Sequence, residues 1–490
     1  MNKHILIWSC AGIMAAGLVL PLQGGEAAAE NAGSDKAAAA EEAAEPLGAS
    51  YSSEVEIKAE DGVGDLDAIS EIYTLENSVD AALRQNSQVR IADENVVQAR
   101  SRYAQNKTLK NLHFNVGNIT TWQNRNAMEN VVVLDSLSDQ LTASLEVLLT
   151  TFGSLEKQIA ASYLQIGVAA WDAVTVKRSI AYEAKKRFFA CLRAEALAEA
   201  AEKHREYCLA SLEDTKSVYS GDKLQLSQAE LLAEEAQAQS QSRIAEKKLC
   251  NSDFLNILED RNTISFAELR FMKPEPVQID PLFDFEDLQE LALKRRSEIL
   301  SIDRSLKVAE ELKESEKCAR NPEVKLSADY IFSPGYHSHP MSMYMLNLRI
   351  NWQAWDGGMR EKKLVELDSQ IRTLEACRDR VVCSVCLDAQ KAWINFNLAS
   401  ELEETARKRL DAAWIYRQAV RKKFLEKKAD FLEVRESLCR LNKAHTEYIK
   451  AYYEKDIAFA GLEYSSGCEF PNRRLEVSKE LLEADQPEVP

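Results

Sequence analysis

Two hydrophobic patterns alternate along the chain. Four short segments alternate apolar and polar residues, the period of a strand whose two faces meet different surroundings. The alternation is regular in residues 139–152, 323–333 and 342–355, whereas residues 112–122 start in the same way and lose register near Gly117. Much longer segments with helical spacing separate these pairs. The pattern therefore predicts long helices joined to a small sheet.

The helical segments are too long for a compact globule. Residues 168–220 and 359–460 contain neither glycine nor proline, the residues that most disfavour a helix interior. Between Leu364 and Phe424, apolar or small residues recur about every 3.5 residues, the spacing of a coiled-coil seam. A helix of about 60 residues spans roughly 90 Å, so we expect an elongated helical structure.

The two halves of the chain repeat one another. An offset of 210 residues places residues 74–100 on residues 284–310, and farther along an offset of 205 places Gly153 on Gly358. Each half is predicted to run helix, strand, strand, long helix, turn, helix. The predicted fold class is mainly α with a small transmembrane β part, internally duplicated.

Composition sets the boundaries of these halves. A basic start, an apolar run and a small-residue cleavage site are typical of an export signal, and an acidic Ala-rich stretch follows it. The net charge of −17, without a basic stripe, argues against nucleic acid as a partner. The predicted division is a signal peptide (1–29), a disordered acidic leader (30–71), a first repeat (72–270), a second repeat (271–465) and a C-terminal tail (466–490).

Three details favour a membrane sheet. The segments have about the 9–11 residues of a tilted spanning strand. Phe152, Trp352 and Trp355 lie toward strand ends, as in an interfacial aromatic girdle, and the polar face carries charges such as Glu146 and Arg349. Four strands cannot close a barrel in lipid, where about eight is the minimum. The chain must therefore share its barrel, and twelve strands from three chains is the natural solution.

The segment Trp355-Asp356-Gly357-Gly358 separates the last predicted strand from a long helix. It lacks the further glycines and the Lys-Ser/Thr of a phosphate loop, and no partner for a catalytic Asp356 stands out. Two glycines permit a turn, and an aspartate there can cap the helix that follows. We interpret the segment as a strand-to-helix joint, with Gly153 as its counterpart in the first half.

Two short motifs leave metal chemistry open as an alternative. His337 and His339 form a His-x-His between two strands, where a polar loop is the other interpretation. Cys383 and Cys386 form a Cys-x-x-C without a second pair, which also suits a packed helix face. No Ser/His/Asp set is present. We predict no catalysis, no metal and no cofactor.

The turns between the long helices fall in residues 219–230 and 424–438. After the second turn, Glu433 and Glu436 lie three residues apart on one helix face. Three chains would bring six such carboxylates near one axis, which favours cations and can form a constriction. The alternative is a solvated acidic face.

Several stretches resemble one known family. They are “NWQAWDGGMREKKL” (351–364), “NPEVKLSADYIF” (321–332), “TLENSVDAAL” (74–83) and “DFLEVRESL” (430–438). The chain resembles the TolC-like outer membrane efflux proteins over about residues 72–465. Several features depart from the family: Lys427 replaces its tip glycine in the second turn, Gly221 is one place off in the first, Asn86-Ser87 and Arg296-Ser297 replace its Asn-Pro, and the first joint is only Thr151-Phe152-Gly153.

The resemblance implies a homotrimer, with a shared twelve-stranded outer membrane barrel and a long α-helical barrel in the periplasm. It implies a passive exit channel of a tripartite efflux or secretion system, type I secretion included, docked to a periplasmic adaptor and an inner membrane transporter. Glu433 and Glu436 would then lie near the closed end of the tunnel. The alternative function is an exported coiled-coil scaffold without a pore.

Overall fold

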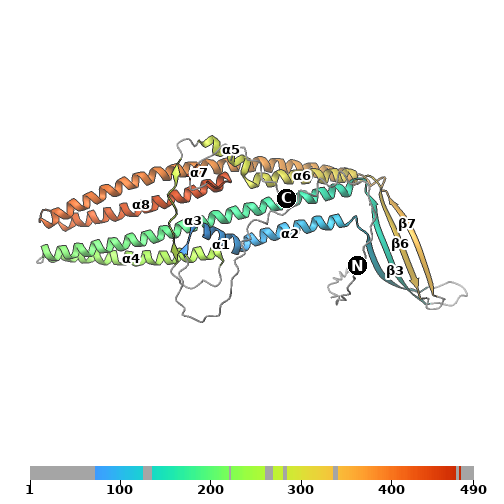
Figure 1. The fold of residues 1–490 in the computed structure, drawn as a ribbon, viewed down its shortest axis with the longest axis horizontal. Coiled ribbons are helices and arrows are strands. Elements are labelled where there is room, and N and C mark those ends of the chain that lie inside the picture. Colours follow the sequence, from blue (N-terminus) through green and yellow to red (C-terminus); the bar gives the residue numbers. More distant parts are fainter. Residues whose placement is uncertain are drawn as a thin grey trace, which may run out of the picture. The chain divides into compact units, whose positions relative to one another are not determined.

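The computed structural model describes residues 72–124, 135–219, 222–259, 269–279, 284–334, 340–470 and 474–475. The predicted signal peptide and acidic leader and most of the tail lie outside these residues. Within them, long helices dominate, and one antiparallel sheet lies at the end of the helices (Figure 1). The predicted fold class, mainly helical with a small β part, is confirmed.

The elements of the two halves follow in the same order. Leu75 and Phe285 begin the first helices, and Ser87 and Ser297 begin the second, so both pairs keep the offset of 210 residues. The first half contains α1 (Leu75–Gln85), α2 (Ser87–Thr108), β2 (His113–Asn124), β3 (Asp135–Thr150), α3 (Ser154–Val218) and α4 (Lys223–Leu258). The second contains α5 (Phe285–Arg295), α6 (Ser297–Cys318), β6 (Glu323–Ser333), β7 (Met341–Asn351), α7 (Met359–Leu425) and α8 (Phe431–Ser466).

In each half, one very short parallel strand pair joins the start of the half to its end. β1 (Ile72–Tyr73) pairs with β4 (Arg270–Phe271) in the first half. β5 (Gln278–Ile279) pairs with β8 (Arg474–Leu475) in the second half. The start and the end of each half are thus held together beside the helices.

Short polar residues begin several helices. The side chains of Thr74, Asp222 and Asp430 accept hydrogen bonds from backbone N–H groups at the starts of α1, α4 and α8. α3 and α7 have 65 and 67 residues, which corresponds to about 100 Å each. By length and composition α3 is apolar enough to cross a membrane, but it packs against α2, α4, α6 and α8. Its apolar residues therefore serve the packing of the bundle.

Buried side chains form the seams between the helices. The predicted 3.5-residue pattern on α7 is buried at Val385, Ala389, Phe396, Ala399, Ala406, Val420 and Phe424. Leu402 and Tyr416, which belong to the same pattern, are exposed. Where α3 and α7 end, the Tyr219 and Phe424 rings lie 5.4 Å apart, centroid to centroid. These two residues occupy equivalent places in the two halves, so the helical hairpins meet at their tips.

The sheet has the strand order β2-β3-β6-β7, and every neighbouring pair is antiparallel. β2 runs through Gly117 without a break, because Gly117 pairs with Thr142, and the Thr142 hydroxyl donates to the Gly117 carbonyl over 3.2 Å. The pairing thus continues although the alternation of apolar and polar residues is lost at Gly117: Asn118 lies on the face of Val116, and Ile119 lies on the opposite face. β3 carries an irregularity between Leu148 and Thr150.

Two of the strands end earlier than the sequence predicts. β7 ends at Asn351 because its partner Glu323 is the first residue of β6, so nothing remains for later residues to pair with. Trp352 and Trp355 consequently follow the strand. β3 ends at Thr150, where the Thr150 hydroxyl accepts a 3.1 Å hydrogen bond from the Phe152 N–H and turns the chain.

Candidate functional site

The register gives the four-stranded sheet two chemically different faces. Each face is built from cross-strand rows that contain one residue of each strand. One apolar row consists of Phe114, Leu145, Ala328 and Leu346. One polar row on the opposite face consists of His113, Glu146, Ser327 and Asn347.

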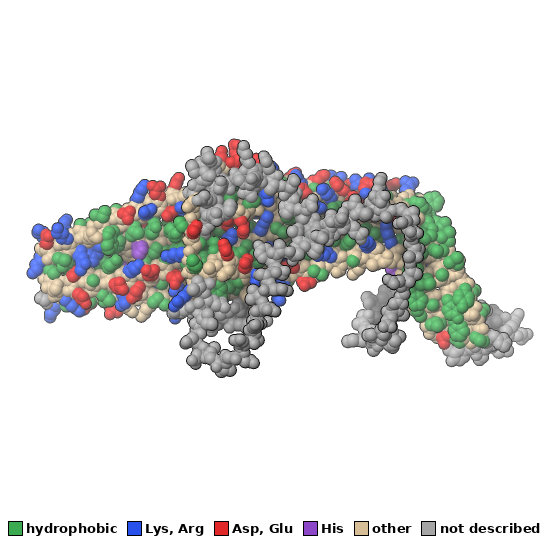
Figure 2. All heavy atoms as spheres, viewed as in Figure 1, with side chains coloured by type: hydrophobic (Ala, Val, Ile, Leu, Met, Phe, Trp, Pro, Cys, Tyr) green, Lys and Arg blue, Asp and Glu red, His purple; other side chains and the backbone are tan. Residues whose placement is uncertain are grey.

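The apolar face is exposed in the single chain. Phe114 is 65% exposed, Leu346 is 75% exposed and Tyr344 is 82% exposed. Figure 2 shows hydrophobic side chains gathered over the sheet, whereas the helices carry charges of both signs. An apolar surface this continuous marks a place that is covered by lipid or by another protein.

The polar face is hydrogen-bonded along and across its strands. The Asp329 carboxylate accepts hydrogen bonds from the Ser327 hydroxyl at 3.0 Å and the Asn347 amide at 2.7 Å. Lys325 Nζ lies 2.9 Å from Glu323 and 3.8 Å from Glu146. Exposed ion pairs of this kind add little stability. Because these groups are polar and charged, this face of the sheet is suited to contact with water and not to a protein core.

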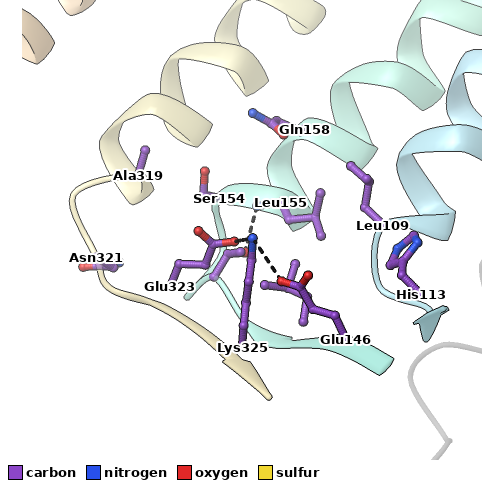
Figure 3. Close-up of a pocket in the computed structure, with 12 residues that line it drawn as sticks. Leu109, His113, Glu146, Ser154, Leu155, Gln158, Ala319, Asn321, Glu323 and Lys325 are labelled. Carbon is purple, nitrogen blue, oxygen red and sulfur yellow. Dashed lines mark hydrogen bonds and ion pairs between the residues drawn. The ribbon is translucent and has the colours of Figure 1, made fainter. Parts of the chain in front are cut away.

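A cavity of about 430 Å³ lies where the polar face meets the helices. Figure 3 shows Lys325 reaching between Glu323 and Glu146, with His113 across the cavity and Gln158 of α3 above it. Eight of the twelve residues that line the cavity are polar, and the cavity continues the polar face toward the helices.

Within the described parts of the chain, both edges of the sheet are open: β2 pairs with β3 only, and β7 pairs with β6 only. Unpaired backbone groups at an edge are a template for another strand, and they are not tolerated in lipid. In the alternating order of directions, β7 and the β2 of another copy would run antiparallel, like every other pair in the sheet.

The second strand-to-helix joint is built around Asp356. Its carboxylate accepts hydrogen bonds from the N–H groups of Gly358 and Arg360, each at 3.0 Å, so it caps the start of α7. The Arg360 N–H, followed by that of Gly358, holds the pKa of Asp356 below its usual range. Gly357 and Gly358 have φ of +70° and +87°. This left-handed backbone is the reason for two glycines.

The first joint uses different residues in the same geometry. Gly153 has φ of +99°, and the preceding Phe152 has φ of +52°, so a phenylalanine occupies the place of Gly357. The Thr151 hydroxyl accepts a 3.0 Å hydrogen bond from the Leu155 N–H, as Asp356 does from Arg360. Asn321 donates to the Phe152 carbonyl over 3.3 Å. The sequence motif missed Thr151 as a cap, although the 205-residue offset places it on Asp356.

The three predicted interface aromatics lie at these joints. Phe152 is 52% exposed, Trp352 is 65% exposed and Trp355 is 84% exposed. The Trp352 indole donates to the Arg320 carbonyl over 3.2 Å, which ties the end of β7 to the turn after α6. All three therefore stand at the level where strands become helices.

The predicted tip carboxylates lie on the outside of α8. Glu433 and Glu436 are both exposed. Glu436 forms an ion pair with Arg440, whose guanidinium lies 5.5 Å from the centre of the Tyr416 ring. Glu433 has no ion pair within the part of the chain that the structure describes. Lys427, in the turn before α8, has φ of +59°, the conformation that a glycine would adopt more easily.

The remaining motifs form no metal centre in the described part of the chain. His337 and His339 lie outside the described residues. Cys383 and Cys386 lie on α7, where the Gln289 amide contacts the Cys386 sulfur at 3.5 Å. No group of three or more His, Cys, Asp or Glu side chains suited to a metal occurs among the residues described above.

Sequence comparison finds no relative: no protein-family model matches, and no curated protein is similar. Solved structures do match the fold. The outer-membrane channel OprN matches with a TM-score of 0.69 at 18% identity, covering 81% of this chain and 90% of that one. The outer membrane protein VceC of Vibrio cholerae has a TM-score of 0.67 at 13% identity, covering 80% and 96%. The CmeC outer membrane channel of Campylobacter jejuni has a TM-score of 0.67 at 13% identity, covering 80% and 85%.

This chain has the TolC-like fold. The TolC-like fold accounts for both kinds of element, since the matched region covers four-fifths of the chain and includes most of each neighbour. At 13–18% identity, the likeness is one of fold, and few side chains are shared. For the same reason the TolC-like sequence resemblance rests on a few stretches at joints and turns.

Proposed function

We propose that this TolC-like chain is a passive outer membrane channel through which substrates leave the cell. One observation carries the proposal: the register of four strands places apolar side chains on one exposed face and polar, charged ones on the other. A strand pair in lipid needs the first face toward the acyl chains and the second toward a wet lumen. The solved structures with this fold are described as outer membrane channels.

The open edges require more than one chain. Two chains would supply eight strands, and barrels of about that size are filled by their own side chains. Three chains supply twelve strands, which leaves an aqueous interior and keeps every pairing antiparallel. We therefore propose a homotrimer whose β7 edges pair with the β2 edges of neighbouring copies.

The helices support the same assembly. Within the chain, α8 of the second half packs on α3 of the first half. The helix equivalent to α8 is α4, and the helix equivalent to α3 is α7. Large apolar side chains remain exposed on both of these helices, namely Leu231, Ile244 and Leu249 on α4 and Leu387, Ile394, Leu398 and Leu402 on α7. We propose that the α4 of one copy covers the α7 of the next, which closes the helices into a periplasmic barrel.

The proposed channel performs no chemistry and takes its energy from partners. By the resemblance, these are a periplasmic adaptor and an inner membrane transporter that dock at the tips of the helical hairpins. Glu433 and Glu436 lie beside these tips, and we propose that they contribute to a cation-sensitive constriction. Co-purification with an adaptor and a transporter encoded near this gene tests the partner part of the proposal.

A matched pair of substitutions tests the channel. Leu346→Arg places a charge on the apolar face, which in lipid costs about 2–4 kcal/mol near the midplane. Asn347→Arg places the same charge one residue along, on the polar face. We expect the Leu346→Arg variant to be missing from the outer membrane fraction. We expect Asn347→Arg to insert, to form a trimer in detergent and to conduct ions in planar bilayers with altered selectivity.

Equal membrane insertion of the two variants would contradict the assignment of the faces. A purified wild-type chain that stays monomeric and soluble without detergent would overturn the channel altogether.

A further inference from the structure

Three methionines form a column on the polar face of the sheet. Met341, Met343 and Met345 alternate along β7 with Ser342 and Tyr344, so their side chains share one face. The same face continues along β7 as Asn347 and Arg349. The chain has only 8 methionines, so three within five residues do not reflect a methionine-rich composition.

The register shows what surrounds this column. Met341 pairs with Ser333, and Met345 pairs with Asp329. Met341 is 59% exposed and Met343 is 40% exposed, so neither fills a core. One carboxylate oxygen of Asp329, Oδ2, accepts hydrogen bonds from Ser327 and Asn347. Three thioether sulfurs therefore follow one another along the edge strand, beside a single carboxylate.

Thioethers are soft ligands that favour Cu(I) over hard or borderline cations. Alternate residues of a strand lie roughly 6.6 Å apart along its axis. The methionine side chain has three rotatable bonds, enough for the sulfurs of neighbouring positions to converge on one ion.

We propose that Met341, Met343 and Met345 bind a soft monovalent cation of the Cu(I) and Ag(I) class. The site itself stands on the register of β7. Its place in the lumen of a channel rests on the proposed function.

The test uses full-length protein labelled with selenomethionine, in detergent and chloride-free buffer, with silver nitrate as the probe. Selenium absorption spectroscopy reports only methionine ligands, and silver is added in excess over the free cysteine thiols, which bind Ag(I) more tightly than thioethers. We expect a silver neighbour in the selenium spectrum that Zn²⁺ does not displace, and calorimetry should show one more Ag(I) per chain in the parent than in a variant that lacks the three methionines.

The decisive variant is the triple substitution Met341→Leu, Met343→Leu and Met345→Leu, which keeps side-chain volume and removes the sulfurs. Met272→Leu with Met359→Leu is the control, because these methionines are 60% and 66% exposed and lie off the sheet. The triple variant should lose the silver neighbour and one bound Ag(I), and the control should lose neither. An unchanged silver signal in the triple variant, or its loss in the control, overturns the proposal.

Binding and conduction are read separately. Silver binding by a chain that does not conduct would leave the methionine site standing and refute the channel. A conducting trimer with no selenium–silver contact would support the channel and refute the methionine site.

Discussion

Replacing Gly358 by alanine isolates the backbone strain of the second strand-to-helix joint. No heavy atom lies within 4 Å of a Cβ added at Gly358, so the change introduces no clash. The cost comes from φ of +87°, because a left-handed backbone costs an L-residue about 1–2 kcal/mol. The smaller entropy of the unfolded alanine chain offsets about 0.4–1 kcal/mol of this. We expect a net loss of about 1 kcal/mol per chain, and a larger loss for valine, which is β-branched.

Gly167→Ala is the matched control. Gly167 lies inside α3, and the nearest atom to an added Cβ is Arg304 Cδ at 3.7 Å, an ordinary contact. Alanine in a helix interior is more stable than glycine by roughly 0.5–1 kcal/mol. The same chemical change should therefore have opposite signs at the two positions.

The assay is guanidinium unfolding in one detergent, followed by far-UV circular dichroism, with midpoint and slope compared between variants. Gly358→Ala should lower the midpoint and Gly167→Ala should raise it, with unchanged slopes. A Gly358→Ala variant as stable as the parent would refute the reasoning that the joint needs a left-handed backbone. We also expect Gly358→Val to reduce trimer yield while leaving the ion selectivity of the remaining trimers unchanged.

Three further predictions concern the tips and the joint. Lys427→Gly should raise stability by up to about 1 kcal/mol in the same unfolding assay, because φ of +59° strains the lysine; a lower midpoint would contradict this. Glu433→Gln with Glu436→Gln should weaken cation preference and block by multivalent cations in bilayers, and unchanged selectivity would return both residues to a solvated face. The lowered pKa of Asp356 means that its stabilising contribution is complete above its unfolded pKa of about 3.9 and is lost as pH falls through the folded value. Asp356→Asn should flatten this acid limb of the stability–pH curve, and an equally steep limb in the variant would assign the acid sensitivity to other carboxyls.

The joint at residues 356–358 is the part of the molecule that local sequence describes best. An aspartate followed by two glycines restricts the backbone to a cap and a left-handed turn, whatever lies around it. The glycine-free helices are local in the same sense, since their period and composition leave no other regular structure. The repeated order of helices and strands and the turn before α7 could be predicted on this basis.

The first joint shows where local reasoning stops. Phe152 adopts φ of +52° although phenylalanine does not favour it, and Asn321, 169 residues away, holds its carbonyl. Only a contact made by the folded chain can hold a residue in a conformation that its own chemistry opposes. The strand end at Asn351 has a similar cause, because it depends on where the partner strand begins.

What the sequence determined by itself is therefore the set of elements, their order and the turns with special backbone chemistry, because periodicity and turn propensity are local. Only the tertiary structure decided which surfaces are covered. α3 and α7 are equivalent helices, yet α8 packs on α3, whose Phe188 and Leu192 share a buried cluster with Ile449 and Tyr453 of α8, whereas Leu398 on α7 stays exposed. The same holds for the methionines of β7, which alternation places on the face of Asn347 and Arg349, whereas only the register shows which residues of β6 lie beside them. Pairing and packing join residues that are distant in the chain, and no local pattern records which of several possible partners they meet.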